Sequence, residues 1–314
     1  MDVSIIQPGA WLSQTVFKLP QAVDIAHFKL AWEATVASTQ VLRTRLVQTE
    51  DHRVLQMVLG KSDIPWHMAG NLKDYLETTA SFLMGYGDPL AHYAIVHEEG
   101  STFFILNIHH SLYDGWSIPL MLQKMEMCYN GFVTKAMPTE VPFGRFIRHN
   151  MSFDPDAWRN FWKANLAGAR RTAFPCLQFS SADLFPQATS KTSLSVPLPQ
   201  RPASSITLST TLRAAWAIIL SRHAKSPDVT FGMFLTGRTA PIKDIESIIA
   251  PTIALVPIRI TLSPSSSVPE FLAAVQAQAT VMMPFEQAGI QNIRTLGPDA
   301  EAACAFDAML IVHP

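Results

Sequence analysis

The residues best suited to chemistry lie together at positions 109–117, which read His-His-Ser-Leu-Tyr-Asp-Gly-Trp-Ser. An imidazole titrates near neutral pH, so His110 could accept a proton from an attacking amine or hydroxyl. Asp114, four residues later, could fix the geometry of the loop or of the ring. Gly115 could adopt a positive φ or bring a backbone amide close to a developing oxyanion. The segment predicts a site where an imidazole base acts beside an oxyanion.

Two strands and a helix are expected to position this segment. Residues 91–96 and 102–108 are apolar runs on either side of a Glu-Glu-Gly turn, which predicts a hairpin whose second strand ends at the two histidines. Residues 117–129 predict an amphipathic helix that begins just after the Asp-Gly pair. The imidazoles are therefore expected at the end of a buried strand, facing a cleft.

Predicted strands and helices alternate in both halves of the chain. Further strands are expected at 13–19, 41–47, 54–59, 229–234, 253–262 and 306–312, and further helices after the N-cap Asp24 and at 72–83, 156–166, 210–223 and 268–282. Between residues 170 and 202 the composition shifts to Ser, Pro, Thr and Gln, which indicates a crossover between two lobes. The fold class is α/β with mixed sheets.

The composition excludes several classes of function. Lys and Arg number 24 against 25 Asp and Glu among 314 residues, so the basic excess of a nucleic-acid-binding protein is missing. No stretch approaches the ~20 consecutive apolar residues of a membrane span, and the first residues do not resemble a signal peptide. The three cysteines, Cys128, Cys176 and Cys304, are far apart, which indicates a reducing, cytoplasmic setting and no zinc site.

The segment 109–117 resembles the HHxxxDG signature of condensation domains from nonribosomal peptide synthetases, and its Tyr-Asp-Gly-Trp-Ser continuation is most similar to fungal members. Other segments resemble further blocks of the family and follow in the family's order: Val-Leu-Arg-Thr-Arg at 41–45, the segments 231–241 and 249–259, Pro-Phe-Glu-Gln at 284–287, and Cys-Ala-Phe-Asp at 304–307. The resemblance spans nearly the whole chain.

This resemblance implies a V-shaped pair of lobes, each similar to chloramphenicol acetyltransferase, with a tunnel between them. Residues 1–169 would form the N-terminal lobe that carries the signature, residues 170–202 the crossover, and residues 203–314 a partial C-terminal lobe. Both ends are expected to be truncated relative to the family, with the last strands of the C-terminal lobe missing.

The resemblance also implies a reaction and its partners. A donor acyl or peptidyl thioester and an acceptor aminoacyl thioester would arrive on the 4′-phosphopantetheine arms of carrier domains, and an amide bond would form between them. Neighbouring adenylation domains are expected partners, whereas nucleic acid and membrane are not. The chain itself is expected to bind no cofactor and no metal ion.

Single residues receive roles by matching the family's motif. His110 matches the active-site histidine, as a base or as the group that orients the amine, and His109 matches the first histidine, whose role would be structural. Asp114 matches the aspartate that holds the loop, with Arg43 as its expected ion-pair partner. Gly115 matches the glycine whose amide faces the reacting centre. Substrate contacts are expected at Trp116, Ser117, Thr252 and Ala254.

Two other functions stay open at this point. One is a related HxxxD acyltransferase that uses coenzyme A. The doubled histidine and the block at 249–259 are evidence against it. The other is a non-catalytic remnant that only docks carriers. The chain also departs from the family at two places: Ser-Thr-Gln at 38–40 replaces the usual Arg-His-Glu, and Ala250 stands where glycine is common.

Overall fold

The computed structural model describes residues 9–60, 63–131, 141–174, 192–196 and 205–312. The chain divides into two compact units. The first unit comprises Met1–Met151 and Pro241–Thr252, and the second comprises Ser152–Ala240 and Ile253–Pro314. Each unit has its own β-sheet and its own buried core.

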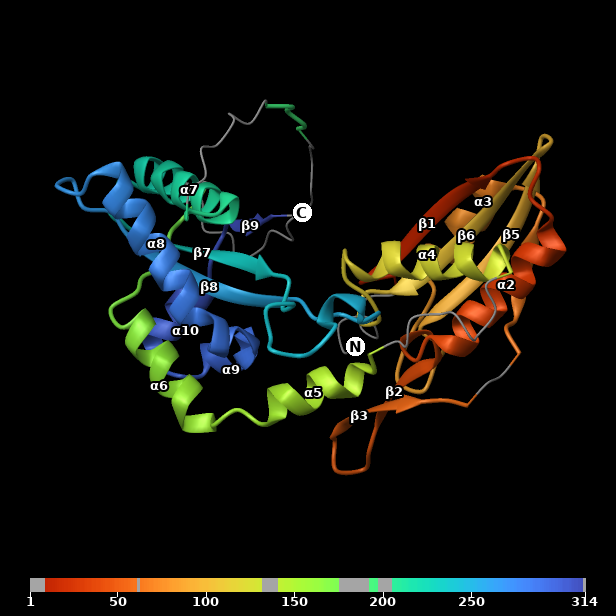
Figure 1. Cartoon of the computed structure of the whole chain (residues 1–314), viewed down its shortest axis with the longest axis horizontal. Coiled ribbons are helices and arrows are strands. Elements are labelled where there is room, and N and C mark those ends of the chain that lie inside the picture. The colour runs from red at the N-terminus through yellow and green to blue at the C-terminus, as the bar shows by residue number, and fades with distance from the viewer. Residues whose placement is uncertain (1–8, 61–62, 132–140, 175–191, 197–204, 313–314) are drawn as a thin grey trace. The chain divides into compact units, whose positions relative to one another are not determined.

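A four-stranded sheet forms the centre of the first unit (Figure 1). Its strands lie in the order β1 (Leu12–Leu19), β6 (Ser101–His109), β5 (Ala91–Glu98) and β4 (Trp66–Ala69). The first three strands run antiparallel to their neighbours, and β4 runs parallel to β5. The hairpin of β5 and β6 confirms the prediction, and its second strand ends at His109.

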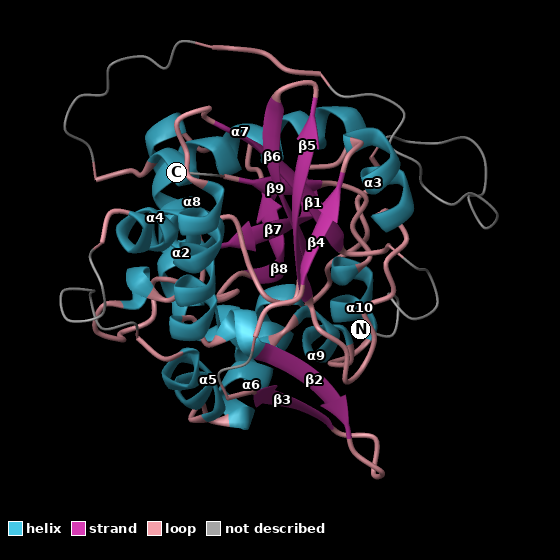
Figure 2. Ribbon diagram, turned by 90° about the vertical axis from the view of Figure 1, so that its right-hand side faces the viewer, coloured by secondary structure: helices cyan, strands magenta, loops and turns pink. Residues whose placement is uncertain are grey.

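Helices cover both faces of this sheet (Figure 2). Successive side chains of a strand point to opposite faces of its sheet. On one face, Phe104 of β6 packs on Phe28 and Trp32 of helix α2 (Ile25–Ser38). Asn107, on the opposite face of β6, donates to the hydroxyl of Tyr75 in α3 (Leu72–Thr79). Helix α4 (Ser117–Tyr129) packs beside α2 and has the bounds that the sequence predicts.

A separate antiparallel hairpin joins β2 (Thr44–Gln48) to β3 (Val54–Val58). The strand expected at 41–47 begins later, because Val41–Arg43 forms a 3-10 turn. Every residue of β3 is exposed. The first unit also contains helix α5 (Phe143–Met151).

A three-stranded sheet forms the centre of the second unit, in the order β8 (Ala254–Thr261), β7 (Asp228–Leu235) and β9 (Met309–Ile311). Strand β8 is antiparallel and β9 parallel to β7. The helices of this unit are α6 (Pro155–Leu166), α7 (Leu208–Ala224), α8 (Val268–Met282), α9 (Ile290–Arg294) and α10 (Pro298–Cys304). Their apolar side chains form one cluster with those of β7 and β8.

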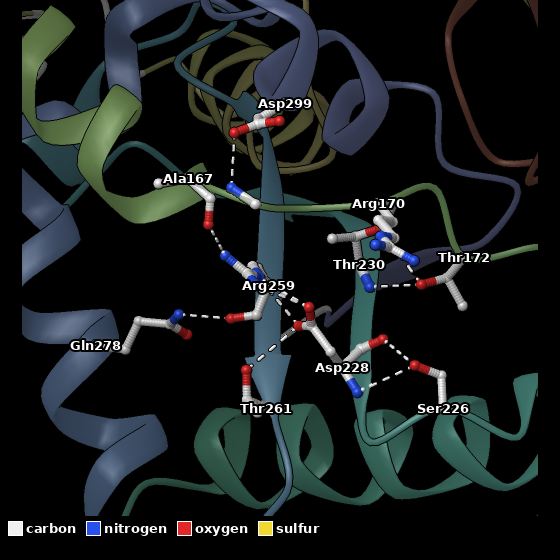
Figure 3. A network of polar contacts seen from close by, with 11 residues as sticks. Ala167, Arg170, Thr172, Ser226, Asp228, Thr230, Arg259, Thr261, Gln278 and Asp299 are labelled. Atoms are coloured by element: carbon white, nitrogen blue, oxygen red, sulfur yellow. Dashed lines mark hydrogen bonds and ion pairs between the residues drawn. The ribbon is translucent and has the colours of Figure 1, made fainter.

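A polar network joins the end of α6 to this sheet (Figure 3). Arg259 of β8 donates from Nε and Nη2 to the carboxylate of Asp228, at 2.9 and 2.8 Å, and from Nη1 to the carbonyl of Ala167. Asp299 accepts the N–H of Gly168 at 2.6 Å. A forked guanidinium can bind several acceptors at once, so Arg259 holds strand and helix end together.

The predicted class, mixed α/β, is confirmed, while the division of the chain differs from the expected boundaries of 169 and 203. Helix α6 belongs to the second unit because Trp162 and Leu166 are fully buried in its core. The segment Pro241–Thr252 belongs to the first unit although both of its flanks belong to the second. The expected crossover at 170–202 falls largely outside the described residues.

The V-shaped arrangement and the tunnel stay predictions. Among the described residues, no helix has the length and apolar character needed to cross a membrane.

Candidate active site

Strand β6 delivers the two histidines of the site. Successive residues of a strand point to opposite sides, and here His109 is 3% exposed while His110 is half-buried. The backbone N–H of His110 donates to the carbonyl of Trp11 at 2.8 Å, just before β1 begins. This bond continues the pairing of β1 with β6 and fixes the backbone that carries the imidazole.

His109 is held as a neutral side chain. Its Nδ1 accepts the backbone N–H of Ser111 at 3.1 Å and lies 2.8 Å from the Ser111 hydroxyl. A nitrogen that accepts from an amide carries no proton, so the ring has its proton on Nε2. Burial lowers the pKa of His109 from 6.5 to about 4. These contacts tie the imidazole of His109 to the loop that follows it.

His110 has the opposite tautomer. Its Nδ1 lies 3.2 Å from the carbonyl oxygen of Tyr113, and a carbonyl can only accept, so Nδ1 must carry the proton. The lone pair of the neutral ring is then on Nε2. The imidazole stacks on the ring of Tyr113, with centroids 4.6 Å apart and planes within 13°. The loop thus presents a base or hydrogen-bond acceptor in a fixed orientation.

Asp114 is fully buried, and its carboxylate accepts hydrogen bonds from Trp116, Ser117 and Thr252. Its Oδ1 accepts the N–H of Ser117 at 2.9 Å, the hydroxyl of Ser117 at 2.6 Å and the N–H of Trp116 at 3.1 Å. Its Oδ2 accepts the N–H of Thr252 at 2.9 Å and lies 3.3 Å from the Thr252 hydroxyl. A carboxylate at the start of α4 is also favoured by the helix dipole. These bonds hold the loop in place.

The segment Pro241–Thr252 packs against this loop within the first unit. Besides the contact of Thr252, the carbonyl of Glu246 accepts the indole N–H of Trp116 at 2.9 Å. The hydroxyl of Ser117 lies 3.1 Å from the carbonyl of Ala250 and 2.6 Å from Asp114 Oδ1. One hydroxyl proton serves one acceptor at a time, and the shorter, charge-assisted bond is to the carboxylate.

A family model for the condensation domain matches residues 6–313 of the chain. The chain belongs to the condensation-domain family. Similar relatives of this condensation domain are large fungal proteins. Nonribosomal peptide synthetase TES of Alternaria alternata is 40% identical over all of this chain, which spans 6% of that protein. Nonribosomal peptide synthetase atnA of Emericella nidulans is 36% identical over all of this chain, which spans 4% of that protein.

Solved structures agree on the fold of the domain. The crystal structure of holo T3CT superposes with a TM-score of 0.75 at 24% identity, covering 95% of this chain and 70% of that chain. The starter condensation domain of rhizomide synthetase gives a TM-score of 0.74 at 14% identity, covering 100% of this chain and 76% of that chain.

The structure brings together most of the residues that the sequence proposes for the condensation site. His109, His110, Asp114, Gly115, Trp116, Ser117 and Thr252 lie within one loop region of the first unit. Ser117 and Thr252 are fully buried on Asp114, so they stabilise the loop instead of lining a surface open to substrate. Ala254 belongs to the second unit, at the start of β8, and is 8% exposed.

The expected ion pair between Arg43 and Asp114 is wrong. Arg43 lies in the turn before β2 and donates from Nη1 to the carbonyl of Leu59, at the base of the β2–β3 hairpin. Its Nε is buried without a hydrogen-bond partner. Gly115 is exposed, and its φ is not in the positive region that favours glycine. The choice of glycine therefore does not come from its φ.

Sequence reasoning missed two aromatic residues beside His110. Tyr113 stands inside the signature and provides both the stacked ring and the accepting carbonyl. Trp11 lies with its ring 6.1 Å from the imidazole, at an angle of 79°. The sequence could have pointed to Tyr113, because it is an aromatic residue three positions after a histidine. It could not have pointed to Trp11, whose place beside His110 depends on the pairing of two strands.

Proposed function

We propose that this condensation domain joins two carrier-bound thioesters by an amide bond. The amine nitrogen of the acceptor aminoacyl thioester attacks the carbonyl carbon of the donor acyl or peptidyl thioester. The tetrahedral adduct collapses, the carbon–sulfur bond of the donor breaks, and the donor carrier keeps a free thiol. The amine proton passes to Nε2 of His110 and from there to the leaving thiolate, so atoms and charge balance.

One observation carries this proposal: the tautomer of His110. The bond from Nδ1 to the Tyr113 carbonyl places the proton on the nitrogen that faces the loop and leaves Nε2 as the acceptor. The ring stack on Tyr113 restricts its rotation. An imidazole held in this way can accept the amine proton or orient the amine by a hydrogen bond.

Orientation of the two thioesters is expected to contribute more than proton transfer. Holding two reactants in a reactive geometry supplies roughly 7–11 kcal/mol of the barrier. A general base supplies about 10²–10⁴-fold in rate, or about 3–5 kcal/mol. We therefore assign the buried bonds of Asp114 to keeping the loop in place, while His110 acts on the proton.

The proposed substrates and partners follow from the same reaction. The 4′-phosphopantetheine arms belong to the partner carrier domains and enter as part of the substrates. Adenylation domains would load those carriers. The relatives that carry similar segments are named nonribosomal peptide synthetases, which supports a place within such an assembly. The described cysteines, Cys128 and Cys304, are free, which supports a reducing, cytoplasmic setting.

The experiment that tests this function supplies the chain with two loaded carriers and identifies the products by mass spectrometry. We expect an amide-linked product on the acceptor carrier and a free thiol on the donor carrier. A parallel reaction replaces the donor carrier with an acyl-coenzyme A. Turnover with the coenzyme A donor alone would contradict the carrier-based reaction. Binding of both carriers without product would instead support a docking role.

A further inference from the structure

Trp11 combines two features that are unfavourable in a folded protein. Its side chain is 60% exposed, although indole is among the largest apolar groups. Its φ is 63°, in the left-handed region that bulky side chains rarely adopt. Strained residues of this kind persist where the surrounding structure fixes them, and they gather at functional sites.

The neighbouring contacts fix this turn from both sides. Gly9 approaches the carbonyl of Ala80 so closely that a Cβ at Gly9 would lie 2.3 Å from its oxygen. The N–H of Leu12 donates to the carbonyl of Gly9 at 3.2 Å, and the carbonyl of Trp11 accepts the N–H of His110 at 2.8 Å. These contacts fix the backbone of Trp11 next to that of His110.

The placement of the indole matters because of what lies next to it. The ring of Trp11 meets the His110 imidazole nearly at right angles, with centroids 6.1 Å apart. Tyr113 already covers one face of that imidazole by stacking. An exposed apolar surface therefore adjoins the side chain that would act on the amine.

We propose that the indole of Trp11 is a contact surface for the apolar acyl part of the donor thioester. This inference rests on the proposed condensation reaction. An acyl chain that lies on the indole removes apolar surface from water, and it brings the thioester carbonyl close to His110. Trp11 would then set the preference of the site for long or bulky acyl groups.

The test compares Trp11→Gly with Trp11→Phe. Glycine adopts φ near 63° without strain, so Trp11→Gly removes the indole while the turn keeps its conformation. We expect its melting temperature to be equal to or higher than that of the wild type. The KM for a decanoyl-loaded carrier should rise about tenfold or more, because a buried aromatic contact is lost. Acetyl-loaded carrier should change little, and Trp11→Phe should restore most of the decanoyl KM.

Matched controls come from two other exposed residues with positive φ. His52 (φ 61°) and Glu99 (φ 48°) lie in the turns of hairpins away from His110. His52→Gly and Glu99→Gly should relieve the same strain and leave both KM values unchanged. An unchanged decanoyl KM in Trp11→Gly would overturn the inference, and a lowered melting temperature with that result would mean that Trp11 packs against protein.

Failure of the proposed condensation reaction can be distinguished from failure of the inference about Trp11. If the wild-type chain forms no amide with any loaded carriers, the proposed function fails, and calorimetric binding of decanoyl-pantetheine still tests Trp11. Weaker binding by Trp11→Gly than by the wild type, with acetyl-pantetheine unaffected, would support the contact. Equal dissociation constants, or no binding by the wild type, would overturn it.

Discussion

Asp114 Oδ2 accepts the backbone N–H of Thr252 at 2.9 Å, across 138 residues of sequence. The signature loop is therefore completed by a segment from the later part of the chain, Pro241–Thr252, which packs in the first unit. The loop that orients His110 and the segment that ends at Thr252 form one buried hydrogen-bonded structure. A substitution that breaks this bond should therefore destabilise both the signature loop and the segment that ends at Thr252.

Asp114→Ala should lower the free energy of unfolding by about 3 kcal/mol or more. The change leaves the N–H groups of Trp116, Ser117 and Thr252 without their acceptor in a buried place. A urea titration of the chain measures the loss. Asp51→Ala is the matched control, because Asp51 pairs with Arg53 at an exposed turn and its loss should hardly change stability. Wild-type stability in Asp114→Ala would contradict this role.

Ser117→Ala should act on stability and leave the substrate KM unchanged. The variant loses the 2.6 Å bond from the hydroxyl to Asp114, which should lower the free energy of unfolding by about 1–3 kcal/mol. Kinetics at varied carrier concentration, together with urea unfolding, separate the two effects. A raised KM at unchanged stability would instead restore Ser117 as a substrate contact.

The stability of the chain should depend on pH through His109. Burial lowers the pKa of His109 from 6.5 to about 4 in the folded state. Below pH 6.5 the unfolded chain binds a proton at this residue before the folded chain does, so stability falls as the pH falls. The loss is complete below pH 4 and amounts to about 3 kcal/mol at most.

The variant His109→Asn isolates this contribution. An asparagine keeps an acceptor for the Ser111 N–H but does not titrate in this range. Urea midpoints between pH 7 and pH 4 should therefore fall more steeply in the wild type than in the variant. Parallel curves would show that His109 is not held neutral by burial.

A second buried charge, in the second unit, gives a further prediction. Arg213 is 3% exposed, and burial lowers its pKa to about 10, while the nearby charge of Glu286 acts in the opposite direction. Glu286 is 6% exposed, its pKa is raised mainly by burial, and it accepts the Thr239 hydroxyl at 2.8 Å.

Glu286→Gln should lower the free energy of unfolding by about 3 kcal/mol, because Arg213 loses the charge that offsets its burial. Glu301→Gln is the control, since Glu301 pairs with Arg294 at the surface and should change stability by less than about 1 kcal/mol. Equal unfolding midpoints for the two variants would contradict the electrostatic role of Glu286.

Local patterns in the sequence predict the elements that carry the site. The helix at Ser117–Tyr129 follows from apolar periodicity after the Asp-Gly pair, and the hairpin that ends at His109 follows from two apolar runs around a turn. The role proposed for His110 rests on its place in the signature. These features depend on short stretches of chain, which a sequence shows directly.

Features that depend on distant contacts could not be predicted in the same way. The prediction paired Asp114 with Arg43, but Arg43 bonds to Leu59 at the base of a hairpin. Thr252 was expected to contact the substrate, but it is buried and its N–H donates to the carboxylate of Asp114. Strand β4 was missed because four residues that pair with only one neighbour give too short a pattern.

The division of the chain was missed for a related reason. Helix α6 shows the expected apolar spacing, but nothing local indicates which sheet its Trp162 will pack against. The segment Pro241–Thr252 has no regular strand or long helix, so no local pattern indicates that it belongs to the first unit, where it bonds to Asp114, Trp116 and Ser117.

The proposed action of His110 on the amine proton during amide formation can be tested by one single-turnover measurement. Donor and acceptor carriers are loaded, mixed with excess His110→Ala or wild-type chain, and the rate of amide formation is followed by mass spectrometry. His97→Ala, which changes an exposed histidine of β5, is the control. We expect a rate about 10²-fold or more below wild type for His110→Ala and an unchanged rate for His97→Ala. A wild-type rate in a folded His110→Ala chain would contradict the proposed action.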